Sequence, residues 1–399
     1  MLTAAVIFAA TYVVVALGRA PGIRLDRTGA AVVGAAFMVA FHVVTPERAY
    51  AMVDLGTLVL LFGTMVIVGH LRLAGFFRWV AAGVARRAAS PRQLLAGLVA
   101  VSGLFSAVFV NDTICLALTP LVLEVSSALG VRATPYLLAL ATASNVGSTA
   151  TLTGNPQNML IGVASGIHYR AFCAALAPVA LLGLLIDFLV IAFVFRRELA
   201  APFPTRAEPR ARLHPFLTLK SLAASAAMIA WFFAGANVSM VAFTAGAALL
   251  LTRRVKPEKV FLEINWNLLV LFAGLFVVVG AAREAGVTGV LFDLVHARQA
   301  HGVASFAAAV AVMSNLVSNV PAVMLFSHLV PELPDPRRAW LVLAMASTLA
   351  GNLTVVGSIA NLIVVEGARK LCPISFREYL KVGVPVTLLT LAAGVLMMR

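Results

Sequence analysis

Ten apolar segments constrain this chain more than any other feature, because each approaches the length that crosses a lipid bilayer. A helix needs about 20 mainly apolar residues for one crossing. Of the 399 residues, 61% are hydrophobic and only 12% are charged, which is a low charged fraction for a soluble protein. The sequence therefore predicts an all-α polytopic membrane protein. The ten segments are 2–18, 28–45, 52–71, 134–165, 171–195, 216–233, 238–252, 266–282, 339–365 and 374–398.

Two further apolar stretches, 93–123 and 303–329, are interrupted by polar residues. If each enters and leaves the membrane on the same side, 23 of the 30 Lys and Arg residues fall on one side of the bilayer. Basic residues are retained on the cytoplasmic side. We therefore expect ten crossings and two re-entrant hairpins in the inner (plasma) membrane, with both termini outside. Arg19 follows the first apolar segment directly, which favours a retained helix over a cleaved signal peptide.

The chain contains an internal repeat. Residues 57–75 align without gaps to 268–286, with ten of 19 positions identical, and Gly63/Gly274 and Arg72/Arg283 are among the matches. Leu and Val identities are common between apolar helices, whereas matched Gly and Arg residues are not.

The similarity extends to two later pairs of segments, 110–120 with 318–328 and 141–158 with 344–361. Each half has five crossings, so the second copy is expected to be inverted relative to the first. The predicted organisation is a first repeat at 1–195, a cytoplasmic linker at 196–215 and a second repeat at 216–399.

Polar residues, Gly and Pro interrupt the apolar pattern at matched positions in the two halves. Gly154–Asn155–Pro156 and Gly357–Ser358 are expected to unwind the long segments 134–165 and 339–365. Half-helices that begin near the midplane direct N–H groups and a positive dipole end inward. Together with two hairpin tips they would form a cradle for an oxygen-rich solute, and unwound carbonyls could coordinate a cation beside it.

The candidate substrate-binding residues all lie at these tips and breaks. Small residues there could also serve close helix packing alone, but their coincidence with the repeat favours a binding role. The candidates are Asn111, Thr113, Ser144, Asn145, Gly154, Asn155, Pro156, Asn158, Ser318, Asn319, Pro321, Asn352, Gly357, Ser358 and Asn361.

Asp112 is an ionisable residue in the first hairpin tip, and its repeat partner is Val320. A carboxylate inside a membrane is costly and is usually functional, so Asp112 is the candidate group for coupling H⁺ or Na⁺. The alternative is a structural acid that caps the hairpin. The other candidates for the coupling ion are Asn111, Ser148, Thr149 and Asn319. A second intramembrane acid, Asp187, is expected to be paired structurally with another helix.

Several other classes of protein are disfavoured. Cys115, Cys173 and Cys372 are scattered without metal-binding spacing, so no metal site is expected. No catalytic residues are assigned, and no cofactor is expected other than Na⁺ as a coupling ion. The net charge is +14, but the basic residues lie in short loops between apolar helices. This placement argues against binding to nucleic acid. The chain also lacks a P-loop pattern for ATP.

At the tips and breaks the chain resembles the ion transporter superfamily, with its citrate-transporter-like domain. The tips read Val110–Asn111–Asp112 and Ser318–Asn319–Val320. The Asn-Asp tip and the ten-crossing length are similar to the arsenical pump membrane proteins. The Gly154–Asn155–Pro156–Gln157–Asn158 break is similar to the divalent anion/sodium symporters. The resemblance implies that substrate and cations bind at tips and breaks, and that a transport domain moves past a scaffold.

The expected function is secondary active transport of a small anion or oxyanion, coupled to H⁺ or Na⁺. Arsenite, an inorganic anion and a di- or tricarboxylate are the candidate substrates, and the direction of transport is left open. The absence of arginine from both tips favours a weakly charged solute or cation-coupled uptake. The alternatives are a Na⁺/H⁺ antiporter on the same fold, a membrane-embedded enzyme and a structural subunit. The partners considered are the lipid bilayer, a homodimer and, if the chain is of the arsenical-pump branch, an ATPase.

Overall fold

The computed structural model describes residues 1–18, 22, 24–204, 212–287 and 302–398. In these ranges the regular structure is helical and no β-strand occurs, which confirms the predicted all-α class. Residues 205–211, the middle of the expected linker, lie outside the described ranges.

Six of the described helices are long and apolar enough to cross a membrane. They are α4 (Leu55–Leu73), α6 (Pro91–Val108), α10 (Tyr169–Val194), α11 (Pro215–Phe233), α14 (Trp266–Glu284) and α20 (Phe376–Met397). Shorter apolar helices are α1 (Leu2–Leu17), α2 (Arg27–Ala40), α12 (Val238–Leu250), α16 (Val303–Val317) and α19 (Ile359–Ala368).

Several short helices occupy stretches that the hydropathy pattern treats as connections. Polar caps and N-terminal prolines explain two of them: Thr45 caps α3 (Pro46–Met52), and Pro257 begins α13 (Pro257–Phe261). The amphipathic α5 (Phe76–Arg87) ends in two arginines, which suit the negative end of a helix. Three single 3₁₀ turns, η1 (Glu198–Ala200), η2 (Val330–Glu332) and η3 (Val355–Gly357), complete the described elements.

The two interrupted stretches form helix–turn–helix hairpins. Phe109 and Val110 connect α6 to α7 (Asn111–Ala128), and Ser318 alone connects α16 to α17 (Asn319–Ser327). Ser318 has a φ of 74°, a left-handed conformation that costs a non-glycine residue energy. This tight turn places Asn319 at the first position of α17.

The two long segments are broken, as expected, but each first helix ends before the predicted Gly residue. The first segment divides into α8 (Thr134–Ser148) and α9 (Pro156–Ser165). The second divides into α18 (Pro336–Ala350) and α19 (Ile359–Ala368), with η3 between them. Ser144, Asn145 and Ser148 therefore lie in the last turns of α8 rather than in the unwound backbone.

The helices of the two halves interleave rather than forming two separate bodies. From the first half α2 packs on α14, and from the second half α12 packs on α4. The matched glycines permit these approaches: a Cβ at Gly63 would collide with the backbone of Ala242 on α12, and one at Gly274 would collide with the backbone of Ala31 on α2. The two glycines matched in the repeat therefore serve the same purpose, which is close packing against a helix of the other half.

The equivalent helices α4 and α14 run in opposite directions. At one end of the pair Arg72 of α4 contacts Glu263, which precedes α14, at 2.8 Å. At the other end Met52, which precedes α4, packs against Gly280 near the end of α14. An antiparallel relation between equivalent helices is what an inverted repeat requires, and it supports that interpretation of the sequence.

The long helices α6, α10 and α20 belong to a second group, in which α6 packs on α8, α10 on α20, and α16 on α18. The second half-helices again cross between the halves, because α19 packs on α7 and α9 packs on α17. Both hairpin tips are thereby brought to the broken helices.

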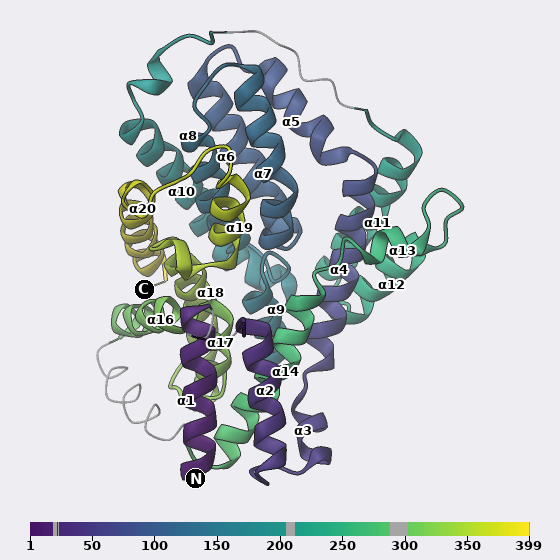
Figure 1. Cartoon of the computed structure of the whole chain (residues 1–399), viewed down its shortest axis with the longest axis vertical. Coiled ribbons are helices and arrows are strands. Elements are labelled where there is room, and N and C mark those ends of the chain that lie inside the picture. Colours follow the sequence, from purple (N-terminus) through teal and green to yellow (C-terminus); the bar gives the residue numbers. More distant parts are fainter. Residues whose placement is uncertain (19–21, 23, 205–211, 288–301, 399) are drawn as a thin grey trace.

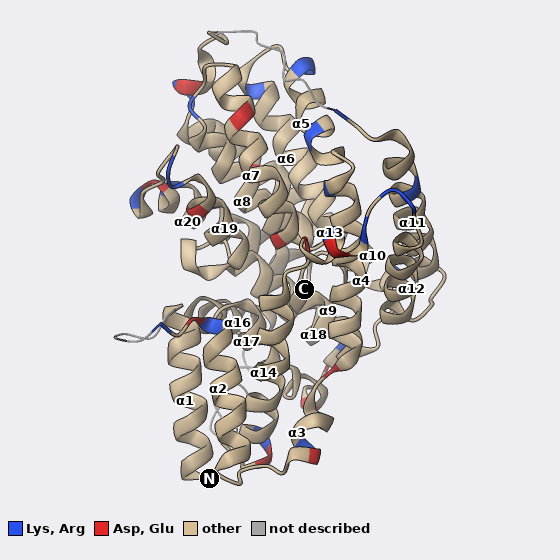
Figure 2. Cartoon of the chain, turned by 45° about the vertical axis from the view of Figure 1, so that its right-hand side comes forward, with Lys and Arg blue, Asp and Glu red and all other residues tan. Residues whose placement is uncertain are grey.

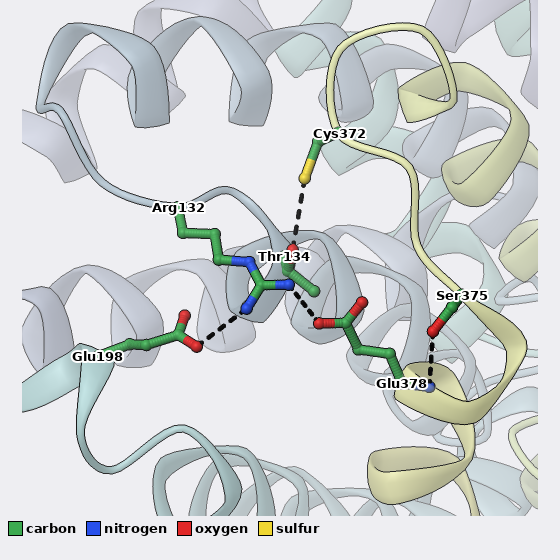
Figure 3. A network of polar contacts seen from close by, with 6 residues as sticks. All are labelled: Arg132, Thr134, Glu198, Cys372, Ser375 and Glu378. Atoms are coloured by element: carbon green, nitrogen blue, oxygen red, sulfur yellow. Dashed lines mark hydrogen bonds and ion pairs between the residues drawn. The ribbon is translucent and has the colours of Figure 1, made fainter.

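A three-residue ion network ties the ends of this second group together. Arg132, between α7 and α8, contacts Glu198 at 3.1 Å and Glu378, in the first turn of α20, at 2.5 Å (Figure 3). Beside it the Thr134 hydroxyl lies 3.3 Å from the sulfur of Cys372. The network joins segments from both halves of the chain.

Charged residues gather mainly at helix ends and connecting segments, and the walls of the long helices carry few (Figure 2). No described Lys or Arg is buried. This distribution fits helices whose sides face lipid and whose ends face water.

Candidate functional site

Asn145, in the last turn of α8, is the centre of a buried hydrogen-bond network that joins both halves of the chain. Its Oδ1 accepts from the side chains of Asn111 at 2.8 Å and Ser358 at 3.0 Å. Its amide nitrogen donates to Asn352 at 2.8 Å and Asn361 at 3.0 Å. One hairpin tip and the opposite helix break therefore meet at a single residue.

The network repeats itself across the two halves. Ser358 donates to Asn145, and at the equivalent positions Asn155 donates to the hydroxyl of Thr348 at 3.2 Å. Gln157 also donates to Thr348, at 3.2 Å. Thr348 and Gln157 were absent from the sequence-based candidates. The repeat alignment itself contained the signal for Thr348, since 348 is the repeat partner of 145.

Two equivalent asparagines hold the unwound segments in shape. The amide nitrogen of Asn158 donates to the carbonyls of Ser148 at 3.1 Å and Thr151 at 2.9 Å. The amide nitrogen of Asn361 donates to the carbonyls of Gly351 at 2.7 Å and Thr354 at 3.1 Å. These bonds satisfy backbone carbonyls that the helix break would otherwise leave unpaired in a membrane.

The first hairpin tip is attached to the first break through the backbone. The N–H of Asn111 donates to the carbonyl of Gly154 at 2.9 Å. A Cβ at Gly154 would collide with the backbone of Ser148 and Ser106, so only glycine allows this approach. Pro156 starts α9, where its missing N–H is not needed, and Thr113 is buried in the first turn of α7.

The second tip is attached to the second break through a side chain. With its amide nitrogen facing its acceptors, Asn319 donates to the carbonyls of Gly357 at 3.0 Å and Ser347 at 3.1 Å. Ser314 lies 2.6 Å from the same amide. Pro321, also a candidate, instead accepts a hydrogen bond from Tyr12 of α1 at 3.2 Å through its carbonyl.

The candidates for the coupling ion divide into two groups. The hydroxyls of Ser148 and Thr149 donate to the carbonyl of Asn145, at 2.8 Å and 3.3 Å, so they stabilise the end of α8. Ser144 similarly donates to Ala141 and accepts from the thiol of Cys115 at 3.0 Å.

Asp112 is different, because its carboxyl is 5% exposed and makes no hydrogen bond or ion pair with any described residue. Arg27, at the start of α2, is the cation that acts on it electrostatically, without an ion pair within 4 Å. A carboxylate without a hydrogen-bond or ion-pair partner at a buried tip is energetically costly.

Most amide hydrogens of this network are donated within the protein, whereas two amide oxygens and the hydroxyls of Ser106 and Thr354 have no partner in the described part of the chain. The amide nitrogens of Asn111, Asn145 and Asn158 all donate within the protein. The Oδ1 atoms of Asn111 and Asn158, both buried, have no partner in the described part of the chain. Even the backbone N–H groups at the starts of α7 and α9 are partly used, since Asn158 N–H donates to Asn155. The expected cradle of free donors is thus only partly present.

Two cavities approach this region from opposite ends of α14. One has a volume of about 790 Å³ and is lined by residues near the end of α14, including Arg283 and Glu284, with Leu160 of α9. The other, of about 660 Å³, is lined by Asn267 at the start of α14, by Arg27 and by residues next to the second break. The first lies between α14 and the half-helix α9, and the second lies between the α2/α14 pair and the half-helix α19.

No group of three or more His, Cys, Asp or Glu residues that could hold a metal occurs within the described residues. Amide and hydroxyl groups therefore dominate the chemistry of the site. Such groups bind polar solutes and hard cations without covalent chemistry.

The helical hairpins, the broken helices and the buried polar junction between them define a membrane transporter. The chain belongs to the citrate transporter family, whose sequence profile matches residues 12–335. This confirms the resemblance to the ion transporter superfamily and the expectation that the chain is not an enzyme.

Named relatives cover almost the whole chain. A silicon efflux transporter, LSI3, from Oryza sativa subsp. japonica is 32% identical over 94% of this chain and 93% of its own length. An uncharacterized transporter, Rv2684, from Mycobacterium tuberculosis is 31% identical over 98% of this chain and 96% of its own. A putative transporter, arsB, from Dictyostelium discoideum is 24% identical over 93% of this chain and 87% of its own.

A solved structure shares the fold. The Alcanivorax borkumensis YdaH transporter superposes with a TM-score of 0.59 at 13% sequence identity, covering 100% of this chain and 96% of that chain. At this level of identity the likeness concerns the fold alone.

Proposed function

We propose that this protein is a secondary active transporter of a small oxyanion in its protonated, hydroxyl-bearing form, driven by H⁺ or Na⁺. We further propose that it lies in the inner (plasma) membrane with both termini outside, because that orientation leaves most basic residues in the cytoplasm.

The unpartnered acceptors carry the proposal. A buried acceptor without a donor costs about 1–3 kcal/mol, which a ligand recovers when it supplies the donor. Oδ1 of Asn111 and Oδ1 of Asn158 are two such acceptors. A fully ionised oxyanion offers only acceptors, whereas a hydroxy acid offers O–H donors and a cation offers charge. The site therefore favours a protonated solute with a cation beside it.

The lack of buried cations in the described residues argues against a multiply charged carboxylate. Carboxylates are usually bound by Arg in paired, charge-assisted hydrogen bonds. Silicic and arsenous acids are uncharged hydroxy compounds near neutral pH. The names of the rice and Dictyostelium relatives, which refer to silicon efflux and to arsB, agree with this class of solute.

Asp112 is the proposed coupling group. It lies beside Asn111, whose side chain donates to Asn145, so a cation on Asp112 can affect the network at the junction. Protonation or Na⁺ binding would remove the cost of a buried charge. The same residue supports the second candidate function, a Na⁺/H⁺ antiporter in which cations alone bind.

A flux experiment separates these functions. The purified protein in proteoliposomes would be given arsenite, silicic acid or citrate, each with and without a pH gradient or a Na⁺ gradient. We expect gradient-driven movement of the hydroxy acids and little movement of citrate. Citrate transport without arsenite or silicic acid transport would contradict the proposal. Exchange of Na⁺ for H⁺ with no solute dependence would establish the antiporter instead.

A further inference from the structure

Asp187, in the middle of α10, is a second buried acid, and it is not part of the network around Asn145. Its side chain is 0% exposed, and neither carboxyl oxygen has a hydrogen-bond partner in the described part of the chain. The side chain of Thr142, on α8, acts on the carboxyl group, so the expected pairing with another helix stays a prediction. An ionised carboxylate without a partner in such a place is highly unfavourable.

The surroundings of Asp187 accommodate a neutral acid better than a charged one. The hydroxyl of Thr142 on α8 lies beside the carboxyl but outside hydrogen-bond geometry, and it donates its own proton to the carbonyl of Leu138 at 2.8 Å. Its oxygen can therefore accept a hydrogen bond from the protonated acid. No described cation acts on Asp187.

Among the helices packed on α10, the ionisable group that interacts electrostatically with Asp187 is the phenol of Tyr379 on α20. Tyr379 donates to the carbonyl of Asn352 at 3.2 Å, and Asn352 donates to the carbonyl of Thr142 at 3.2 Å. The other helices that pack on α10 are α6, α8, α11 and α18, and no charge from them acts on Asp187.

These contacts connect Asp187 to the junction. Thr142 and Tyr379, the two polar neighbours of Asp187, are both bonded to Asn352. Oδ1 of Asn352 accepts from Asn145. A rearrangement of the second break that moves Asn352 must change the environment of Asp187, and a change of charge at Asp187 must act on Asn352.

We infer that Asp187 is a second proton-binding site of this protein, which carries a proton in the conformation described and releases it when the contacts around Asn352 rearrange. The inference rests on the proposed transport function for its role in the cycle. In the transport cycle Asp187 would carry one proton in addition to any ion that Asp112 binds.

The first test does not depend on transport. Infrared spectra of the purified protein would be recorded over a range of pH, for the wild type and for Asp187→Asn. We expect a carbonyl band from a protonated carboxylic acid that Asp187→Asn removes. Asp335→Asn is the matched control, because Asp335 is an exposed N-cap of α18 and Asn caps equally well. A wild-type spectrum without a band that depends on Asp187 would overturn the inference.

The second test measures the number of protons moved per solute from the gradient at which net flux reverses. We expect this ratio to fall by one in Asp187→Asn and to stay at the wild-type value in Asp187→Glu and Asp335→Asn. An unchanged ratio and pH profile in Asp187→Asn would overturn the inference. If Asp187→Asn does not fold, Asp187→Glu decides, because the infrared band must then shift. Wild-type protein that moves no hydroxy acid would contradict the proposed function, while the infrared result would still report on Asp187.

Discussion

The side-chain amide of Asn145 donates a hydrogen bond to Oδ1 of Asn352 at 2.8 Å, although the two residues are 207 positions apart in the chain. Asn145 lies in the last turn of the first half of one broken helix, and Asn352 lies just past the end of the first half of the other. The two broken helices thus meet end to end through neutral amides. A solute bound there would contact both halves of the protein at once.

Replacing Asn145 by alanine should weaken substrate binding without preventing membrane insertion. The change leaves Asn111, Asn352, Asn361 and Ser358 without a shared partner. Each buried polar group left unpaired costs about 1–3 kcal/mol. We expect solute affinity in purified protein to decrease by about tenfold or more, which corresponds to at least 1.4 kcal/mol.

The matched control is Asn237→Ala. Asn237 caps α12 through a hydrogen bond to the N–H of Met240 and lies outside the junction. It should reduce stability slightly and leave affinity unchanged. Equal losses of affinity in both variants would mean that Asn145 has no special role in binding.

Replacing Asp112 by asparagine should uncouple transport from the ion gradient. The variant keeps the size of the side chain but has no charge to neutralise by a proton or Na⁺. We expect gradient-driven flux to fall by about tenfold or more, because no charge remains for the ion gradient to act on. Exchange of labelled solute across the membrane should persist in part. If flux keeps its dependence on Na⁺ and pH, Asp112 is a hairpin cap only.

Replacing Arg132 by alanine should lower thermal stability modestly and leave substrate affinity unchanged. Arg132 is half exposed, and its two ion pairs join α20 to η1, the turn that follows α10. Exposed ion pairs contribute up to about 1 kcal/mol each. The melting temperature in detergent should fall, and the difference from wild type should shrink at high salt.

Arg377→Ala is the control for this prediction, because Arg377 is exposed, neighbours Glu378 and forms no ion pair with a described residue. Arg132→Lys should recover stability only in part, since one ammonium group cannot present the planar fork that reaches both acids. Equal melting temperatures for Arg132→Ala and wild type would show that the network does not stabilise the fold.

The proposed topology can be tested with single cysteines at Leu2 and Ala201, which are both exposed. The background would carry Cys372→Ser, because Cys115 and Cys173 are buried while Cys372 is partly exposed. In intact spheroplasts an impermeant thiol reagent should label position 2 but not position 201. Labelling of position 201 alone would reverse the assigned orientation.

The sequence by itself determined the class of fold, because insertion into a bilayer depends on the length of each apolar segment and on the charges beside it. Both are local properties of the sequence. It also located the hairpins and the broken helices, since Gly, Pro and Asn at matched positions disrupt a helix wherever it packs. The glycines shared by the two halves, Gly63 and Gly274, were visible as identities. The reason for these glycines became visible only in the structure, where each one allows a helix from the other half to pack closely.

Tertiary structure alone decided which polar groups form hydrogen bonds and which are left without a partner. Asn111 and Asn319 look equivalent in the alignment, yet one is tied to its break by its backbone and the other by its side chain. Asp187 looked like half of a structural pair, and the fold leaves both of its carboxyl oxygens without a hydrogen-bond partner in the described part of the chain. The physical reason is that a hydrogen bond depends on distance and direction between atoms that are remote in sequence. A pattern of residues specifies which donors and acceptors exist, and only packing determines which of them meet.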